Sequence, residues 1–87
     1  MKILAEPIDT LVMFKGNEKP MPYRFKYVDQ KGVRQEVKID KILYTEESRM
    51  AGVRAFIYSC QSIIAQEDKR YELKYIVAEC RWELYKM

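Results

Sequence analysis

Two five-residue stretches, Tyr23-Arg24-Phe25-Lys26-Tyr27 and Tyr71-Glu72-Leu73-Lys74-Tyr75, decide the fold. In each stretch, large apolar side chains alternate with charged ones at a period of two. Because successive side chains of a strand point to opposite faces, each stretch directs its apolar side chains to one face and its charges to the other. Aromatic side chains also favour strands, since they pack well on a pleated, half-buried surface. The two stretches therefore predict an antiparallel sheet with one buried face and one solvated face.

Strand patterns continue on both sides of these stretches. In the segment Ile8–Phe14 both parities are apolar, Leu11 and Met13 included, which indicates a strand covered on both sides. A hairpin turn is expected at Asp29-Gln30-Lys31-Gly32, followed by a returning strand from Val33 to Tyr44. Beyond Lys41 the apolar parity of this strand changes, which is typical of a β-bulge, and we expect one near Asp40-Lys41. The last strand is expected to carry Cys80, Trp82 and Leu84.

The segment from Glu46 to Gln66 is compatible with two structures. Met50, Val53, Ile57, Cys60 and Ile64 recur at helical spacing, and two glutamates precede them as at a helix N-terminus. Gly52 and the run Phe56-Ile57-Tyr58-Ser59-Cys60 favour a strand instead. We favour the strand, with one helix around residues 47–65 as the alternative.

These patterns predict an all-β fold of five or six antiparallel strands, curled into a small barrel or a highly twisted sheet. The alternative is an α+β fold that contains the helix at 47–65. Because 87 residues do not suffice for a second core, we expect a single β domain over residues 1–87. The aromatic share of 13% is enough to build a small core without disulfides or metal.

Charge and cysteine content bear on location. The net charge of +3 is only mildly basic, and no stretch has the length of a signal peptide or a membrane span. We therefore expect a cytoplasmic protein that does not enter a membrane. Cys60 and Cys80 could form a disulfide, but without an export signal two buried thiols are the favoured interpretation.

The residue types present argue against an enzyme. The chain contains no histidine, which removes the usual general base near neutral pH, the partner of most nucleophiles and the commonest metal ligand. Two cysteines cannot complete a four-ligand zinc site, and the three glycines match no phosphate-binding loop. We therefore expect no catalytic residues, no metal and no cofactor.

Two kinds of partner fit the chain. A small barrel could bind single-stranded nucleic acid weakly, with tyrosines as stacking platforms and a set of basic side chains on neighbouring strands. The candidate basic residues are Arg24, Lys26, Arg34, Lys38 and Lys74. In a regular strand, however, the basic residues lie on the face opposite the rings, and Glu36 and Asp40 interrupt them.

The favoured interpretation is a non-enzymatic protein-interaction module of unknown process, which binds an unknown protein or a second copy of itself. Small sheets can add a partner strand at a free edge, and tyrosine is enriched at protein interfaces. Tyr44, Tyr58 and Tyr85 have no assured place in the core and are candidates for an exposed aromatic patch.

A resemblance bears on the fold. The stretches Glu6 to Ile8, Pro22 to Tyr27, Tyr71 to Tyr75 and Trp82 to Leu84 resemble small bacterial proteins of unknown function. The resemblance implies an all-β fold and a bacterial source, and it implies no activity and no functional residues.

Overall fold

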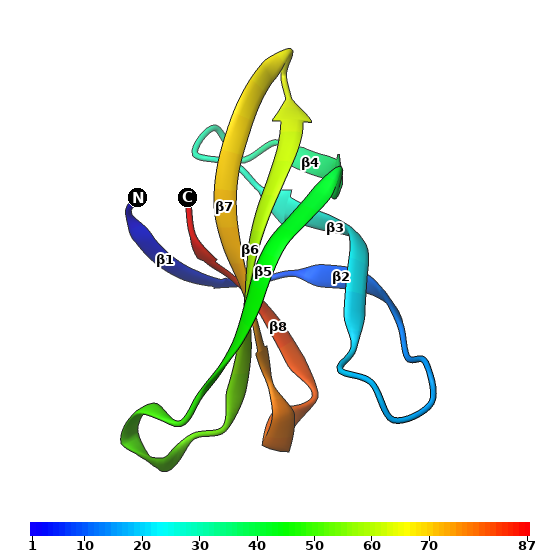
Figure 1. Cartoon of the computed structure of the whole chain (residues 1–87). Coiled ribbons are helices and arrows are strands. Elements are labelled where there is room, and N and C mark those ends of the chain that lie inside the picture. The colour runs from blue at the N-terminus through cyan, green and yellow to red at the C-terminus, as the bar shows by residue number, and fades with distance from the viewer.

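The computed structural model describes residues 1–87, and the period-two patterns form strands in two antiparallel sheets (Figure 1). The strands are β1 (Ile3–Pro7), β2 (Asp9–Met13), β3 (Met21–Val28), β4 (Arg34–Lys38), β5 (Lys41–Ser48), β6 (Ala55–Ile64), β7 (Glu67–Ile76) and β8 (Arg81–Lys86). The all-β prediction is confirmed. The alternative helix at 47–65 is wrong, because β6 occupies half of that range and the only helical turn in it is the short 3-10 turn Met50–Gly52.

The larger sheet has the strand order β1-β8-β7-β6-β5, and the smaller has the order β2-β3-β4. The long strands of the larger sheet are strongly twisted; β2 and the start of β3 lie to one side of them, and the β3–β4 hairpin crosses them in this view (Figure 1). The sheets do not close into a barrel. They are joined by two bends of the chain, one at Ile8 between β1 and β2, and one at Ile39-Asp40 between β4 and β5.

The bend at Asp40 corrects the prediction for residues 33–44. The apolar parity changes there because the chain leaves the smaller sheet and enters the larger one, rather than because one continuous strand bulges. Asp40 holds this corner against β6: its backbone N–H donates to the Gln61 carbonyl at 3.1 Å, and a carboxylate oxygen accepts the Ile63 N–H at 2.9 Å.

Strand β1 was not expected from the sequence. It pairs with β8, and its outer end is held by reciprocal backbone hydrogen bonds between Lys2 and Met87, at 2.9 and 3.1 Å. The ladder is irregular between Ile3 and Glu6, where Ala5 has a positive φ of 48°.

The core lies between the two sheets. Phe25 and Val37 from the smaller sheet pack against buried side chains of β6, β7 and β8, and the Phe25 and Tyr71 ring centroids are 5.4 Å apart. Each of the stretches that predicted the sheet contributes to this core, through Phe25 in β3 and through Tyr71, Leu73 and Tyr75 in β7.

The two cysteines are free and differ in environment. Cys60 is fully buried in β6, as expected for a thiol that packs as a small apolar side chain. Cys80 is exposed in the turn between β7 and β8, so the expectation of two buried thiols is wrong for this residue.

Candidate functional site

A β-bulge in β3 changes which side chains reach the surface. In the ladder between β2 and β3, Leu11 lies opposite Arg24 and Val12 lies opposite Pro22, so Tyr23 is the extra residue. Pro22 and Phe25 are buried, and the two residues between them lie outside the core. Tyr23 is 46% exposed, which corrects the prediction that all three rings of the first stretch share the buried face. The bulge therefore places an exposed ring directly beside Arg24.

Three of the other four predicted basic residues lie on the same face as Arg24. In the ladder between β3 and β4, Arg24 lies opposite Lys38, Lys26 opposite Glu36, and Val28 opposite Arg34. The buried pair Phe25 and Val37 occupies the other face. Because directly opposed residues share a face, Arg24, Lys26, Arg34 and Lys38 all project from the outer side of the smaller sheet.

Lys74 does not belong to this group. It lies in β7, in the larger sheet, opposite Ile57 of β6 and Glu83 of β8. Its ammonium nitrogen is 4.9 Å from the centroid of the Tyr85 ring, close enough for a cation–π contact.

Carboxylates reduce the positive charge of the outer face. Arg24 donates to Glu36 at 2.8 Å, and this hydrogen bond, with the nearby charges of Arg24 and Lys26, lowers the pKa of the Glu36 carboxyl below its usual value. Asp9 lies opposite Lys26 on the β2 side. A shallow hollow of about 200 Å³ lies among these charges, and its lining includes Asp9, Leu11, Arg24, Lys26 and Glu36. The face thus carries interspersed charges with a modest positive excess.

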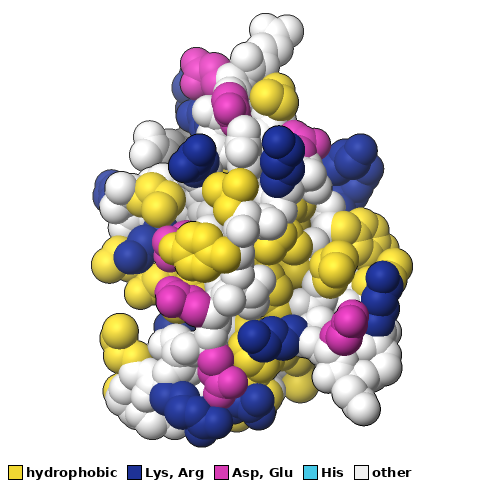
Figure 2. Space-filling view, in the orientation of Figure 1, with side chains coloured by type: hydrophobic (Ala, Val, Ile, Leu, Met, Phe, Trp, Pro, Cys, Tyr) yellow, Lys and Arg dark blue, Asp and Glu magenta, His cyan; other side chains and the backbone are white.

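Apolar side chains lie next to these charges. Met13 of β2 is opposite Met21 of β3, and both point away from the core, at 48% and 44% exposed. Leu11 is 54% exposed on the same side of β2, so the expectation of a strand covered on both sides is wrong. We call Leu11, Met13, Met21 and Tyr23 the β2–β3 patch. Hydrophobic side chains are visible at the surface on the β2 and β3 side of the molecule, with Lys and Arg side chains beside them (Figure 2).

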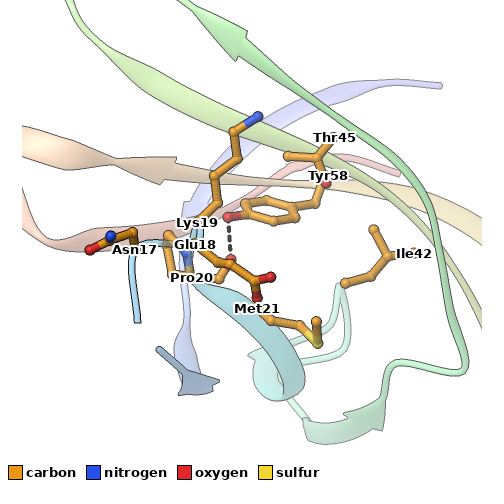
Figure 3. Close-up of a pocket in the computed structure, with 8 residues that line it drawn as sticks. All are labelled: Asn17, Glu18, Lys19, Pro20, Met21, Ile42, Thr45 and Tyr58. Atoms are coloured by element: carbon orange, nitrogen blue, oxygen red, sulfur yellow. Dashed lines mark hydrogen bonds between the residues drawn. The ribbon is translucent and has the colours of Figure 1, made fainter. Parts of the chain in front are cut away.

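An open pocket of about 500 Å³ separates the connection between β2 and β3 from strand β5 (Figure 3). Ile42 and Thr45 of β5 form one wall, and Lys19, Pro20 and Met21 form the opposite one. At the base, the Tyr58 hydroxyl donates a hydrogen bond to the Pro20 carbonyl. The pocket therefore marks the place where the two sheets separate.

The three tyrosines left unassigned by the sequence have different environments. Tyr58 is buried, Tyr85 is half-buried between Lys74 and Lys86, and Tyr44 is 58% exposed on β5. Only Tyr44 is an openly exposed ring as expected.

No three side chains of histidine, cysteine, aspartate or glutamate come together in a way that could hold a metal ion. No helix of the structure has the length and apolar character needed to cross a membrane.

Comparison with protein-family models, with curated proteins and with solved structures finds no match to this chain.

Proposed function

We propose that this chain is a non-enzymatic interaction module that binds a protein partner through the β2–β3 patch. The observation that carries the proposal is the uncovered pair Met13 and Met21, flanked by the exposed Leu11 and Tyr23. Contiguous apolar side chains rimmed by charge are typical of interaction sites, and methionine and tyrosine are enriched there. The cytoplasmic setting expected from the sequence belongs to the same proposal.

The charges beside the patch define the chemistry of the partner. Arg24 is paired with Glu36, but Arg34 and Lys38 form no ion pair within the chain. A partner that offers an apolar segment flanked by acidic side chains would match both features. Such charges affect the association rate and the choice of partner more than the affinity.

Site-specific photo-crosslinking in cells tests this proposal. A photoreactive phenylalanine analogue at Leu11 is expected to give a discrete crosslinked product, and Met13→Asp is expected to abolish it. The matched control carries the same analogue at Ile63, which is 62% exposed on β6, in the other sheet. Equal products from both positions, or a Leu11 product that survives Met13→Asp, would contradict the proposal.

A second candidate function, weak binding of single-stranded nucleic acid, is favoured by the bulge. The sequence placed the rings and the basic residues on opposite faces, whereas Tyr23 is exposed next to Arg24 and on the outside of the core. Stacking on a ring combined with phosphate contacts from neighbouring cations is the usual mode of single-strand binding.

Fluorescence anisotropy with a labelled mixed-sequence oligonucleotide tests this candidate. Binding should strengthen as salt is diluted, since phosphate contacts release counterions. The double change Arg34→Glu and Lys38→Glu should remove it, whereas Lys74→Glu, on the other sheet, should have a smaller effect. Binding weaker than millimolar at low salt, or equal losses in both variants, would eliminate the candidate.

A further inference from the structure

Strand β5 is an edge of the larger sheet and pairs only with β6. No strand pairs with its other edge, and the open pocket adjoins its core face, where Ile42 and Thr45 lie (Figure 3). An edge strand presents backbone N–H and C=O groups that can pair with a further strand. The question is therefore which strand fits this edge.

The charges of β5 point to a second copy of the same strand. Lys41 begins β5 and Glu46 lies near its end; both are exposed, and neither forms an ion pair within the chain. Glu47 differs, because it contacts Arg49 and Arg54, each at 2.9 Å. When two copies of such a strand run antiparallel, the free cation of each copy lies opposite the free carboxylate of the other. The strand is therefore complementary to a second copy of itself.

One antiparallel register satisfies these charges and the two faces of the strand together. It places Lys41 opposite Glu46 of the second copy, Ile42 opposite its Thr45, and Leu43 opposite its Tyr44. Lys41 and Glu46 lie on the face turned away from the smaller sheet, opposite Gln61 and Ile57 of β6. Ile42 and Thr45 lie on the core face, opposite the buried residues Cys60 and Tyr58.

The centre of this register is apolar. Leu43 is the extra residue of a second bulge, between Ile42 and Tyr44, and it is 43% exposed while Tyr44 is 58% exposed. A twofold axis between Leu43 and Tyr44 would bring four such side chains together, two from each copy. Aromatic–aliphatic cross-strand pairs of this kind stabilise antiparallel ladders.

The pocket provides space for the rest of the contact. Ile42 and Thr45 already form its β5 wall. In this register, Ile42 and Thr45 of the second copy point to the same, core-facing side of the joined sheet as the pocket. The core-facing side chains of a paired strand would thus adjoin this open pocket rather than meet a packed wall.

From this convergence we propose that two copies of the chain pair antiparallel through β5, so that their larger sheets join into one continuous sheet across a twofold axis. The contact is isologous, and each copy contributes the same surface. This inference goes beyond the proposed function, because the contact is made by β5; of the β2–β3 patch, only Met21 lines the adjoining pocket.

Charge reversal combined with mixing tests the register directly by analytical ultracentrifugation. The unmodified chain should dimerise in a concentration-dependent way. Lys41→Glu alone and Glu46→Lys alone should each weaken dimerisation on the order of tenfold, since each variant turns two attractive pairs into repulsive ones. An equimolar mixture of the two variants should dimerise as well as the unmodified chain, because both pairs are attractive again.

Lys31→Glu is the matched control, since it makes the same change of charge in the exposed turn between β3 and β4 and should leave dimerisation unchanged. Thermal unfolding confirms that each variant is folded. A monomer at millimolar concentration would overturn the proposal. So would a dimer that is insensitive to both reversals, or single variants that fail to associate when mixed.

Discussion

The hydroxyl group of Tyr58 donates a hydrogen bond to the carbonyl oxygen of Pro20, 38 residues earlier in the chain. Tyr58 belongs to β6 of the larger sheet, and Pro20 directly precedes β3 of the smaller one. Both residues are buried, and the Tyr58 ring also packs against Trp82 at a centroid distance of 5.3 Å. This bond therefore connects the two sheets at the base of the open pocket.

Tyr58→Phe removes this connection and leaves the Pro20 carbonyl without its partner. Because an unsatisfied buried acceptor loses its hydration as well as its hydrogen bond, we expect a loss of about 1–3 kcal/mol in the free energy of unfolding. Urea denaturation measures this loss. Tyr23→Phe, at an exposed ring, is the control and should unfold like the unmodified chain. Equal stability of Tyr58→Phe and the control would show that the bond does not hold the sheets together.

Ser62 and Tyr71 form a second buried bond, with their hydroxyl oxygens 2.5 Å apart. Ser62→Ala leaves the buried Tyr71 hydroxyl without its partner, and Tyr71→Phe does the same to the Ser62 hydroxyl. Each change should therefore lower the free energy of unfolding by about 1–3 kcal/mol. The double variant removes both partners and should cost less than the sum, by at least about 0.5 kcal/mol. A double-mutant cycle from urea denaturation gives this coupling, and strictly additive losses would contradict it.

The two thiols should differ in reactivity. Cys80 is exposed and Cys60 is fully buried, and burial raises the pKa of the Cys60 thiol to about 12. Since the thiolate is the reactive form, a disulfide reagent should label one thiol in the native protein and both in denaturant. Cys80→Ser should abolish the native reaction. Persistent labelling of that variant would mean that β6 opens readily.

The raised pKa of Cys60 also predicts a loss of stability in alkali. The unfolded chain releases this proton from its ordinary pKa of 9.0, whereas the folded chain keeps it up to about 12. The unfolded state therefore binds fewer protons across this range, and the stabilising contribution is complete below pH 9.0 and is lost as the pH rises through the range. The loss attributable to this group is at most about 1.4 kcal/mol per pH unit.

Cys60→Ala isolates that contribution from those of other groups, such as Tyr58 and Tyr71, whose pKa values burial also raises. The variant should be less stable at neutral pH because of the cavity it leaves, but its stability should fall less steeply above pH 9.0. Urea denaturation at several pH values gives both slopes, and parallel slopes would contradict the assignment.

Glu36→Gln tests the charge of the outer face. Glu36 is exposed and paired with Arg24, so its removal frees this cation. If the face binds single-stranded nucleic acid, the variant should bind an oligonucleotide several-fold more tightly at low salt, as measured by anisotropy. Unchanged affinity would indicate that Arg24 does not contact phosphate.

Local alternation was sufficient to predict the all-β fold and most strands. The basic face could also be anticipated in part, because Arg24, Lys26, Arg34 and Lys38 flank one hairpin and hairpin pairing places them on one face. The position of Lys74 in a different sheet could not be predicted, since it depends on which strands assemble into which sheet. Strand β1 was missed because Ile3–Pro7 contains a proline and no period-two alternation, and it forms by pairing with the distant β8.

Bulges limited the prediction of the exposed β2–β3 patch. A bulge is defined by two strands, and Tyr23 is the extra residue only with respect to Leu11 and Val12 of β2. Its own sequence context is perfectly alternating, which predicts burial. At Asp40 the parity change was visible, but a bulge and a passage between sheets produce the same local pattern. Only the pairing of β4 with β3 and of β5 with β6 distinguishes them.

The pairing of β1 with β8 has a consequence for biosynthesis. Since β1 pairs with β8, and Lys2 is hydrogen-bonded to Met87, β1 has no partner until β8 has been synthesised. Such distant pairings slow folding and leave strand edges exposed in the meantime. The nascent chain would thus be vulnerable to aggregation until β8 has joined β1, and a circular permutant that connects these two strands by a short loop should fold faster.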